Sequence, residues 1–232
     1  MVTAGERVLR ILSMLSTADH DTGSARLCTV SADALGVSGA GIMLMSPELQ
    51  PGSICSSNLV SARLEELQYE LGEGPSVDAY DQNRPVLEPD LSDPEVPRWV
   101  SFTPPAVRVG ALAVFGFPMD VGDVRVGALT LYRDRPGPLE EHQLADALVM
   151  AKVAAHEVLA MQADAPVDRL PNELEDGANL RIVVHQASGM VAVQLGVSVA
   201  EALVRLRAHA FAHDEPLTAI ATMVVARQLR FT

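Results

Sequence analysis

Residues 178–229 read ANLRIVVHQASGMVAVQLGVSVAEALVRLRAHAFAHDEPLTAIATMVVARQL. This stretch determines how the C-terminal part of the chain folds. Apolar residues recur in it at helical spacing, and Gly196 and Asp214-Glu215-Pro216 interrupt that spacing. The stretch therefore predicts three short helices. We expect the first over residues 177–194, the second to open at Ser198, and the third to begin near Pro216.

The first predicted helix has two different faces. Its apolar stripe, expected in the core, consists of Leu180, Val183, Val184, Ala187, Met190 and Val191. A second stripe, expected to be polar, small and accessible, consists of Arg181, His185, Ser188 and Ala192. Gly189 lies beside this second stripe in mid-helix, where Gly costs about 1 kcal/mol relative to Ala. Such a glycine indicates the close approach of another backbone, from RNA or from a neighbouring helix.

The second and third predicted helices complete a small core. The buried stripe of the second helix consists of Val199, Leu203, Leu206 and Ala210. Its outer face consists of Glu201, Arg205 and His209, and Ser198 with Glu201 predicts a capping box. The third helix contributes Leu217, Ile220, Ala221, Val224 and Val225.

The order of small, polar and apolar residues in this stretch resembles the ANTAR domain, an RNA-binding antitermination module of bacterial signalling proteins. The resemblance rests on Arg181, His185-Gln186-Ala187-Ser188-Gly189-Met190, Gly196, Ser198, Glu201-Ala202, Leu206 and Ala210. It implies that residues 177–232 recognise paired RNA stem-loops with small loops. The RNA-binding residues that it implies are Arg181, His185, Gln186, Ser188, Arg205 and His209, with Ala187 and Gly189 permitting close packing. The family typically has Lys where this chain has Ser188, so one phosphate contact is lost.

Residues 21–163, which follow an amphipathic helix within residues 1–20, have the pattern of an α+β domain. The predicted strands are Ala40–Met45, Ser53–Ser57, Val86–Leu87, Ala111–Pro118 and Arg125–Arg133. The last two form a hairpin joined at Gly122-Asp123. The final strand is apolar on both faces, which predicts a central place in an antiparallel sheet flanked by helices.

Residues 20–160 also resemble a GAF domain, a small-molecule sensor fold. The resemblance rests on GEGPSVDAY (72–80), PVLEPDL (85–91), Trp99, Phe102 and VGALTLYRDRPGPL (126–139). It implies a pocket around residues 60–108 for a small-molecule ligand that the sequence does not identify, with Tyr80, Trp99 and Phe102 as candidate ligand-binding residues or, alternatively, as core aromatics. Ser76 stands where GAF–ANTAR proteins are expected to have Cys, which argues against thiol-based sensing there.

A long helix is predicted over residues 138–163. It carries a heptad-spaced seam of Leu144, Leu148, Ala151, Ala155 and Val158. The seam either lies on the domain's own sheet or pairs with a second copy, in which case the N-terminal helix joins the same bundle. We expect a homodimer through these two helices. Residues 164–176, with Pro166 and Pro171, are the predicted linker between the two domains.

Charge and composition restrict the function further. The net charge of −13 opposes nucleic-acid binding, but residues 177–232 carry five Arg against three acidic residues, so that segment is at +2 and the rest at −15. Cys28 and Cys55 are too few for a disulfide framework and are expected to be two buried thiols in a reducing compartment. No apolar run predicts a membrane span or a signal peptide, which favours the cytoplasm.

Two other classes of function remain as alternatives. Three helices also suit a helix-turn-helix DNA-binding regulator, but that fold needs a basic recognition helix, and the third helix is mostly Ala, Val, Ile and Met. His209 and His213 are four residues apart, but no cysteine lies nearby and no nucleophile motif or phosphate-binding loop is found. We therefore expect no enzyme, no metal and no cofactor.

Overall fold

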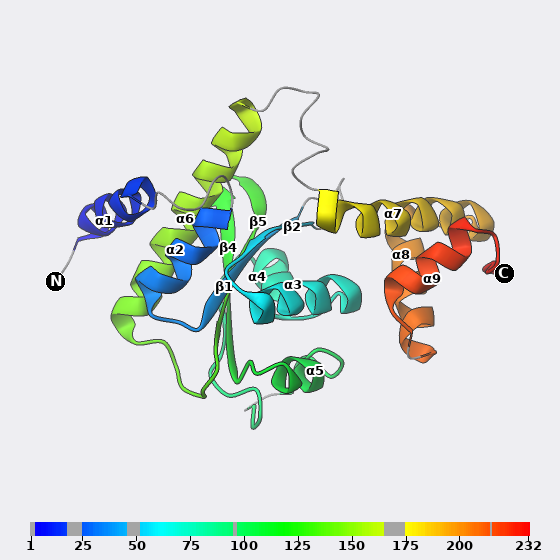
Figure 1. Cartoon of the computed structure of the whole chain (residues 1–232), viewed down its shortest axis with the longest axis horizontal. Coiled ribbons are helices and arrows are strands. Elements are labelled where there is room, and N and C mark those ends of the chain that lie inside the picture. The colour runs from blue at the N-terminus through cyan, green and yellow to red at the C-terminus, as the bar shows by residue number, and fades with distance from the viewer. Residues whose placement is uncertain (1–2, 18–24, 46–51, 95–96, 165–174, 214) are drawn as a thin grey trace. The chain divides into compact units, whose positions relative to one another are not determined.

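Figure 1 shows the computed structural model of the chain. The structure describes residues 3–17, 25–45, 52–94, 97–164, 175–213 and 215–232. The chain divides into two compact units, Met1–Asp164 and Ala165–Thr232. Most of the predicted linker, residues 165–174, lies outside the described residues.

The N-terminal unit is built around a five-stranded antiparallel sheet with the strand order β2-β1-β5-β4-β3. The strands are β1 (Gly39–Leu44), β2 (Gly52–Ser56), β3 (Val86–Glu88), β4 (Ala113–Val121) and β5 (Val124–Arg133). The predicted hairpin is confirmed, because Val121 pairs with Val124 across a two-residue turn. The first turn residue, Gly122, has φ +61°, which glycine adopts without strain. The central place predicted for β5 is confirmed as well.

Helices cover both faces of this sheet (Figure 1). α1 (Ala4–Thr17), α2 (Ala25–Leu35) and α6 (Glu141–Asp164) share the larger apolar core with one face. α3 (Leu59–Leu71) and α4 (Pro75–Gln82) pack on the other face, and the short α5 (Thr103–Arg108) packs against α3. The expected α+β fold is therefore confirmed. α5 begins at Thr103, because Pro104 and Pro105 can occupy only the first turn of a helix.

Most of the predicted heptad seam lies in the core of its own unit. Ala151, Ala155 and Val158 are buried there, while Leu144 is partly buried and Leu148 is 43% exposed. Of the two alternatives, packing on the chain's own sheet therefore holds for Ala151, Ala155 and Val158.

The C-terminal unit is a three-helix bundle, as predicted, with α7 (Glu175–Leu195), α8 (Val199–Ala212) and α9 (Leu217–Val225) in mutual contact. Its core consists of Val184, Ala187, Val191, Ala202, Leu203, Leu206, Ala210, Leu217, Ile220, Ala221 and Val224. Two details of the prediction for α8 are wrong. Val199 is 44% exposed and Ala202 takes its place in the core. Only half of the capping box forms: Ser198 accepts the Glu201 N–H, but the Glu201 carboxylate pairs with Arg205 instead.

Neither cysteine is a free thiol. Cys28 on α2 and Cys55 on β2 form a disulfide, with their Cα atoms 5.9 Å apart. The expectation of two buried thiols is therefore wrong in chemistry, although both residues are buried. The sequence separation of 27 residues gave no sign of the pairing, because only the packing of α2 beside the edge strand β2 brings the two residues together.

Removal of this disulfide is expected to destabilise the N-terminal unit. Closing a loop of this length lowers the entropy of the unfolded chain by an amount worth about 3 to 4 kcal/mol. Cys28→Ser with Cys55→Ser should lower the free energy of unfolding by about that much in guanidinium titrations, and excess reductant should do the same to the wild type. A count of two titratable thiols in the non-reduced, unfolded protein would show that the bond does not form.

Asp146 on α6 fastens α1 to the rest of the unit. Its carboxylate accepts hydrogen bonds from Arg7 and Arg10 of α1, and its side chain is 5% exposed. Burial raises the pKa of this carboxyl, but the hydrogen bonds and charges of Arg10 and Arg7 outweigh it, so that the pKa lies below the ordinary 3.8. The stabilisation is thus fully present above pH 3.8 and is lost as the pH falls through the lowered pKa.

Asp146→Ala should therefore loosen α1. We expect a loss of about 1 to 3 kcal/mol at neutral pH, because Arg7 is left partly buried without its carboxylate and keeps only its hydrogen bond to the His142 carbonyl oxygen. The difference from the wild type should shrink when urea titrations are repeated below the lowered pKa. Glu66→Ala, which removes an exposed partner of Arg63, is the matched control and should change stability by less than about 1 kcal/mol. Equal effects of the two substitutions at neutral pH would contradict this account.

Candidate functional site

α7 presents its two faces differently from the prediction. Ser188 is fully buried and its hydroxyl donates to the Val184 carbonyl oxygen, and Ala192 is 8% exposed. The prediction that the second stripe is accessible is therefore wrong at Ser188 and Ala192. Ser188 offers no surface contact in this conformation. The cause is that α8 and α9 both pack on α7, so the buried surface is wider than one stripe.

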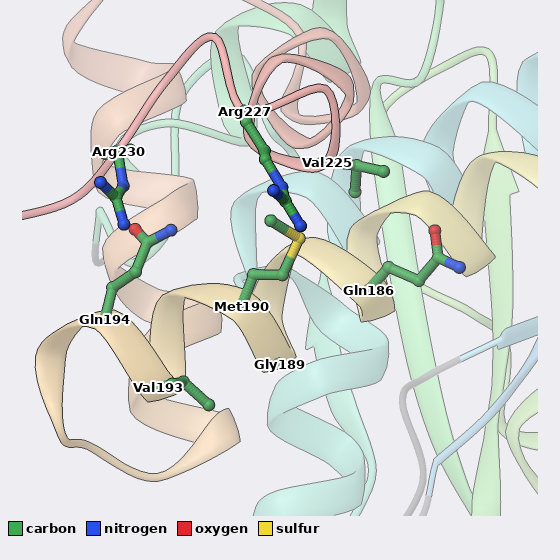
Figure 2. Close-up of a pocket in the computed structure, with 8 residues that line it drawn as sticks. All are labelled: Gln186, Gly189, Met190, Val193, Gln194, Val225, Arg227 and Arg230. Atoms are coloured by element: carbon green, nitrogen blue, oxygen red, sulfur yellow. The ribbon is translucent and has the colours of Figure 1, made fainter.

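The open surface of the helical unit is hollowed into a groove of about 930 Å³. It runs between α7 and the C-terminal segment that follows α9. The groove is lined by Gln186, Gly189, Met190, Val193, Gln194, Val225, Arg227 and Arg230 (Figure 2). We call these eight residues the α7 groove. Its volume lies within the range of small-molecule sites, about 300 to 1,000 Å³.

Two cations stand on one side of the α7 groove. Arg227 points toward Met190, and Arg230 lies beside Gln194 (Figure 2). Both arginines are exposed, and among the residues that the structure describes neither guanidinium has an ion-pair or hydrogen-bond partner. Arg205, by contrast, forms an exposed ion pair with Glu201 at 3.1 Å. The groove therefore presents planar donors that remain open to an anion.

Rings cluster beside the groove. The His209 and His213 rings stack with centroids 4.1 Å apart, and the Phe231 ring meets His209 edge-on at 5.1 Å. The Phe231 N–H donates to the Gln194 side-chain oxygen, which ties this cluster to the groove wall. Burial lowers the pKa of His209, and the charge of His213 lowers it further. Both effects favour neutral His209 near neutral pH.

The eight residues predicted to bind RNA are not all together. Gln186 and Gly189 line the α7 groove, and His185 is exposed on the same helix. Arg205 and His209 lie on α8, and Ala187 and Ser188 are in the core. Arg181 belongs to α7, but its side chain lies outside the described part of the structure.

Arg227 and Arg230 were missed by the sequence prediction, as was Gln194. Both arginines follow the last helix, and the fold of this segment back along α7 is not encoded in any helical period. One signal pointed to the groove, namely Gly189. An added Cβ there would meet no described atom within 4 Å outside its own helix backbone, so no neighbouring helix explains the glycine.

The candidate ligand-binding aromatics of the N-terminal unit lie in its packing. Trp99 and Phe102 are buried and meet edge to face at 5.9 Å, and the Trp99 indole donates to Asp78. Tyr80 is partly buried, and the Arg125 guanidinium lies 5.6 Å from its ring centre. Core packing accounts for the first two residues, and ligand binding by any of the three remains a prediction.

Ser76, at the position expected to hold Cys, is part of a buried polar cluster. Its hydroxyl and its N–H both donate to the Gln68 side-chain oxygen, at 2.6 and 2.7 Å, and the Gln68 amide nitrogen lies 3.4 Å from the Thr130 hydroxyl. All three side chains are buried. The hydroxyl at this position thus has a structural partner.

Residues 172–225 match the ANTAR domain family. The C-terminal unit is an ANTAR domain. The match covers all three helices in full and ends at Val225, the last residue of α9, so Arg227 and Arg230 lie beyond it. ANTAR is a family of RNA-binding antitermination regulators.

The N-terminal unit has the GAF fold. It is similar to the GAF domain of an Acinetobacter phosphoenolpyruvate-protein phosphotransferase, at 16% identity over 69% of this chain and 95% of that chain, with a TM-score of 0.51. The GAF domain of a Coxiella burnetii phosphoenolpyruvate-protein phosphotransferase gives 14% identity over 69% and 95%, with a TM-score of 0.52. At these identities the likeness concerns the fold alone. No curated protein matches the chain.

No single helix among the described residues is long and apolar enough to cross a membrane, although α7 and α8 pass that test as a pair bent by 104°.

Proposed function

We propose that the chain is an RNA-binding regulator that prevents transcription termination, with its GAF unit serving for sensing or dimerisation. The observation that carries the proposal is the ANTAR domain at residues 172–225. Most of that match lies within residues 177–232, which carry five Arg against three acidic residues, whereas the rest of the chain is at −15. The acidic remainder repels the phosphate backbone and directs RNA to this unit. The protein is proposed to act in the cytoplasm, where nascent transcripts are, and to catalyse no reaction.

Competition between RNA structures provides the mechanism. The protein binds a stem-loop in the nascent leader, and the bases held in that stem-loop are then unavailable to the terminator hairpin. At a protein concentration one hundred times its Kd, binding stabilises the bound RNA fold by about 2.7 kcal/mol. That difference shifts the ratio of two competing hairpins about a hundredfold. No chemical step is needed.

The outer face of α8 and the exposed residues of α7 are the proposed contacts. The Arg205 guanidinium lies at the surface in an ion pair with Glu201. Because an exposed pair of this kind contributes little to stability, Arg205 can exchange it for a contact with RNA. His185 and Gln186 are exposed on α7, and hydrogen-bonding side chains of this kind read the unstacked bases of RNA loops.

Binding to RNA hairpins tests the proposal. The full chain, mixed with a pool of hairpins with randomised loops, is expected to select particular loops and to ignore a DNA duplex. Arg181→Ala with Arg205→Ala should weaken binding and reduce the slope of log K against log salt by about 0.7 for each lost phosphate contact. Circular dichroism should show an unchanged helical content. Selection of duplex DNA instead would favour the helix-turn-helix alternative, and selection of neither would exclude the proposal.

We further propose that the chain is a homodimer through α1 and α6. α1 is fastened to α6 by Asp146, and Leu9 and Leu12 of α1 and Leu148 of α6 stay 70%, 39% and 43% exposed. Three large apolar side chains on adjoining helices favour burial against a second copy. A ligand in the GAF unit can then alter the spacing of two RNA-binding domains.

Leu9→Lys with Leu12→Lys is expected to convert the dimer to a monomer in sedimentation velocity, because burial of two ammonium groups opposes association. Val100→Lys, at a 78% exposed position of the same unit outside both helices, is the matched control and should leave the dimer intact. A wild-type chain that sediments as a monomer at working concentrations would rule the dimer out.

A further inference from the structure

We infer that the α7 groove is a nucleotide site: it holds one unstacked RNA loop nucleotide, with Arg227 and Arg230 on the phosphate and the groove amides on the base edge. This inference rests on the proposed function and adds Arg227, Arg230 and Gln194, which the sequence prediction did not contain, to its contacts.

The charges of the groove match this occupant. Arg227 and Arg230 are exposed, come from the same wall, and have no partner among the described residues. An anion bound at this wall would supply the guanidinium groups with a partner of opposite charge. Guanidinium forks fit phosphate oxygens with paired hydrogen bonds.

The floor of the groove suits a base. Met190 and Val193 supply apolar surface, and Val193 is 85% exposed, which leaves it free to pack against a ring. The Gln194 side-chain oxygen is held by the Phe231 N–H at 2.9 Å, so its NH₂ group remains to donate to a base acceptor. Gln186 offers a second amide from the same helix. A base that is hydrogen-bonded at its edge and packed on its face is the usual form of RNA loop recognition.

Two locally unfavourable residues meet at this groove. Gly189 weakens the middle of α7, and no described neighbour takes the space that its missing side chain leaves. Arg227 has φ +59°, a left-handed conformation that non-glycine residues adopt at a cost. The turn at Arg227 closes α9, because the Gln228 N–H donates to the Met223 carbonyl oxygen at 2.8 Å. Gly189 has no such partner among the described residues, and it is explained if the space over it admits a ligand.

The experiment uses the full chain and a hairpin selected from the randomised-loop pool. Arg227→Ala with Arg230→Ala should weaken binding about a hundredfold, in line with the loss of charge-assisted hydrogen bonds. Arg227→Lys with Arg230→Lys should keep the salt slope but lose about tenfold in affinity, because Lys lacks the planar fork. Arg63→Ala with Arg135→Ala, an equal change of charge in the N-terminal unit, should bind as the wild type.

Gly189→Leu separates a binding role from a structural one. Leu favours helix and has open space at this position, so the melting temperature of the helical unit should rise. The Leu side chain also occupies the groove, so RNA affinity should fall about tenfold or more. If Gly189 mattered only for folding, the substitution would change the melting temperature and the RNA affinity in the same direction.

Abasic substitution locates the nucleotide. Each loop position of the selected hairpin is replaced in turn by an abasic unit, and one position should cost the wild type about tenfold or more in affinity. The same position should cost Gly189→Leu nothing further, because the two changes remove one contact. If the hairpin binds both the Gly189→Leu and the double-alanine variants as tightly as the wild type, the groove inference is overturned and RNA binding stands. If no hairpin is selected at all, the proposed function fails and the inference with it.

Discussion

The helical unit depends on one constraint: α7 must bury one side against two helices and leave the other side open. Val184, Ala187 and Val191 are fully buried, and the small side chain of Ala187 lets α8 and α9 both approach. This double packing draws Ser188 and Ala192 into the core and leaves the side with Gln186 and Gly189 for the groove. The interior of the bundle therefore determines which residues can meet RNA.

The helices and strands were easier to predict from the sequence than the tertiary contacts between them. Period-two apolar patterns and the Gly122-Asp123 turn were enough for the β4–β5 hairpin, because a two-residue turn fixes the register locally. The Cys28–Cys55 bond and the return of Arg227 and Arg230 along α7 were not predictable, since each joins residues that only tertiary packing brings together. Ser188 was misplaced for a related reason: a helical period shows which residues share a face, but not how much of the helix its neighbours cover.

The GAF unit is held by close approaches that leave little freedom for change. A Cβ at Gly116 of β4 would lie 2.1 Å from the Pro75 carbonyl oxygen, so α4 rests directly on the strand backbone. Beside it, Ser76 donates twice to Gln68, whose side chain also blocks any Cβ at Gly74. A cysteine in place of Ser76 would be a poorer donor to that oxygen. The serine therefore belongs to a structural network that orients α3 and α4 on the sheet.

The distribution of charged residues favours an anion site on the helical unit. An anion site needs cations without carboxylate partners, whereas Arg7 and Arg10 of the N-terminal unit are paired with Asp146. Residues 226–232, which follow α9, contain no acidic residue, and Arg227 and Arg230 have no ion-pair partner among the described residues. The helix-weakening Gly189 lowers the stability of the free unit. A ligand that is anionic at one end and flat at the other offsets that loss, because its phosphate pairs with the guanidinium wall and its base fills the space over the glycine.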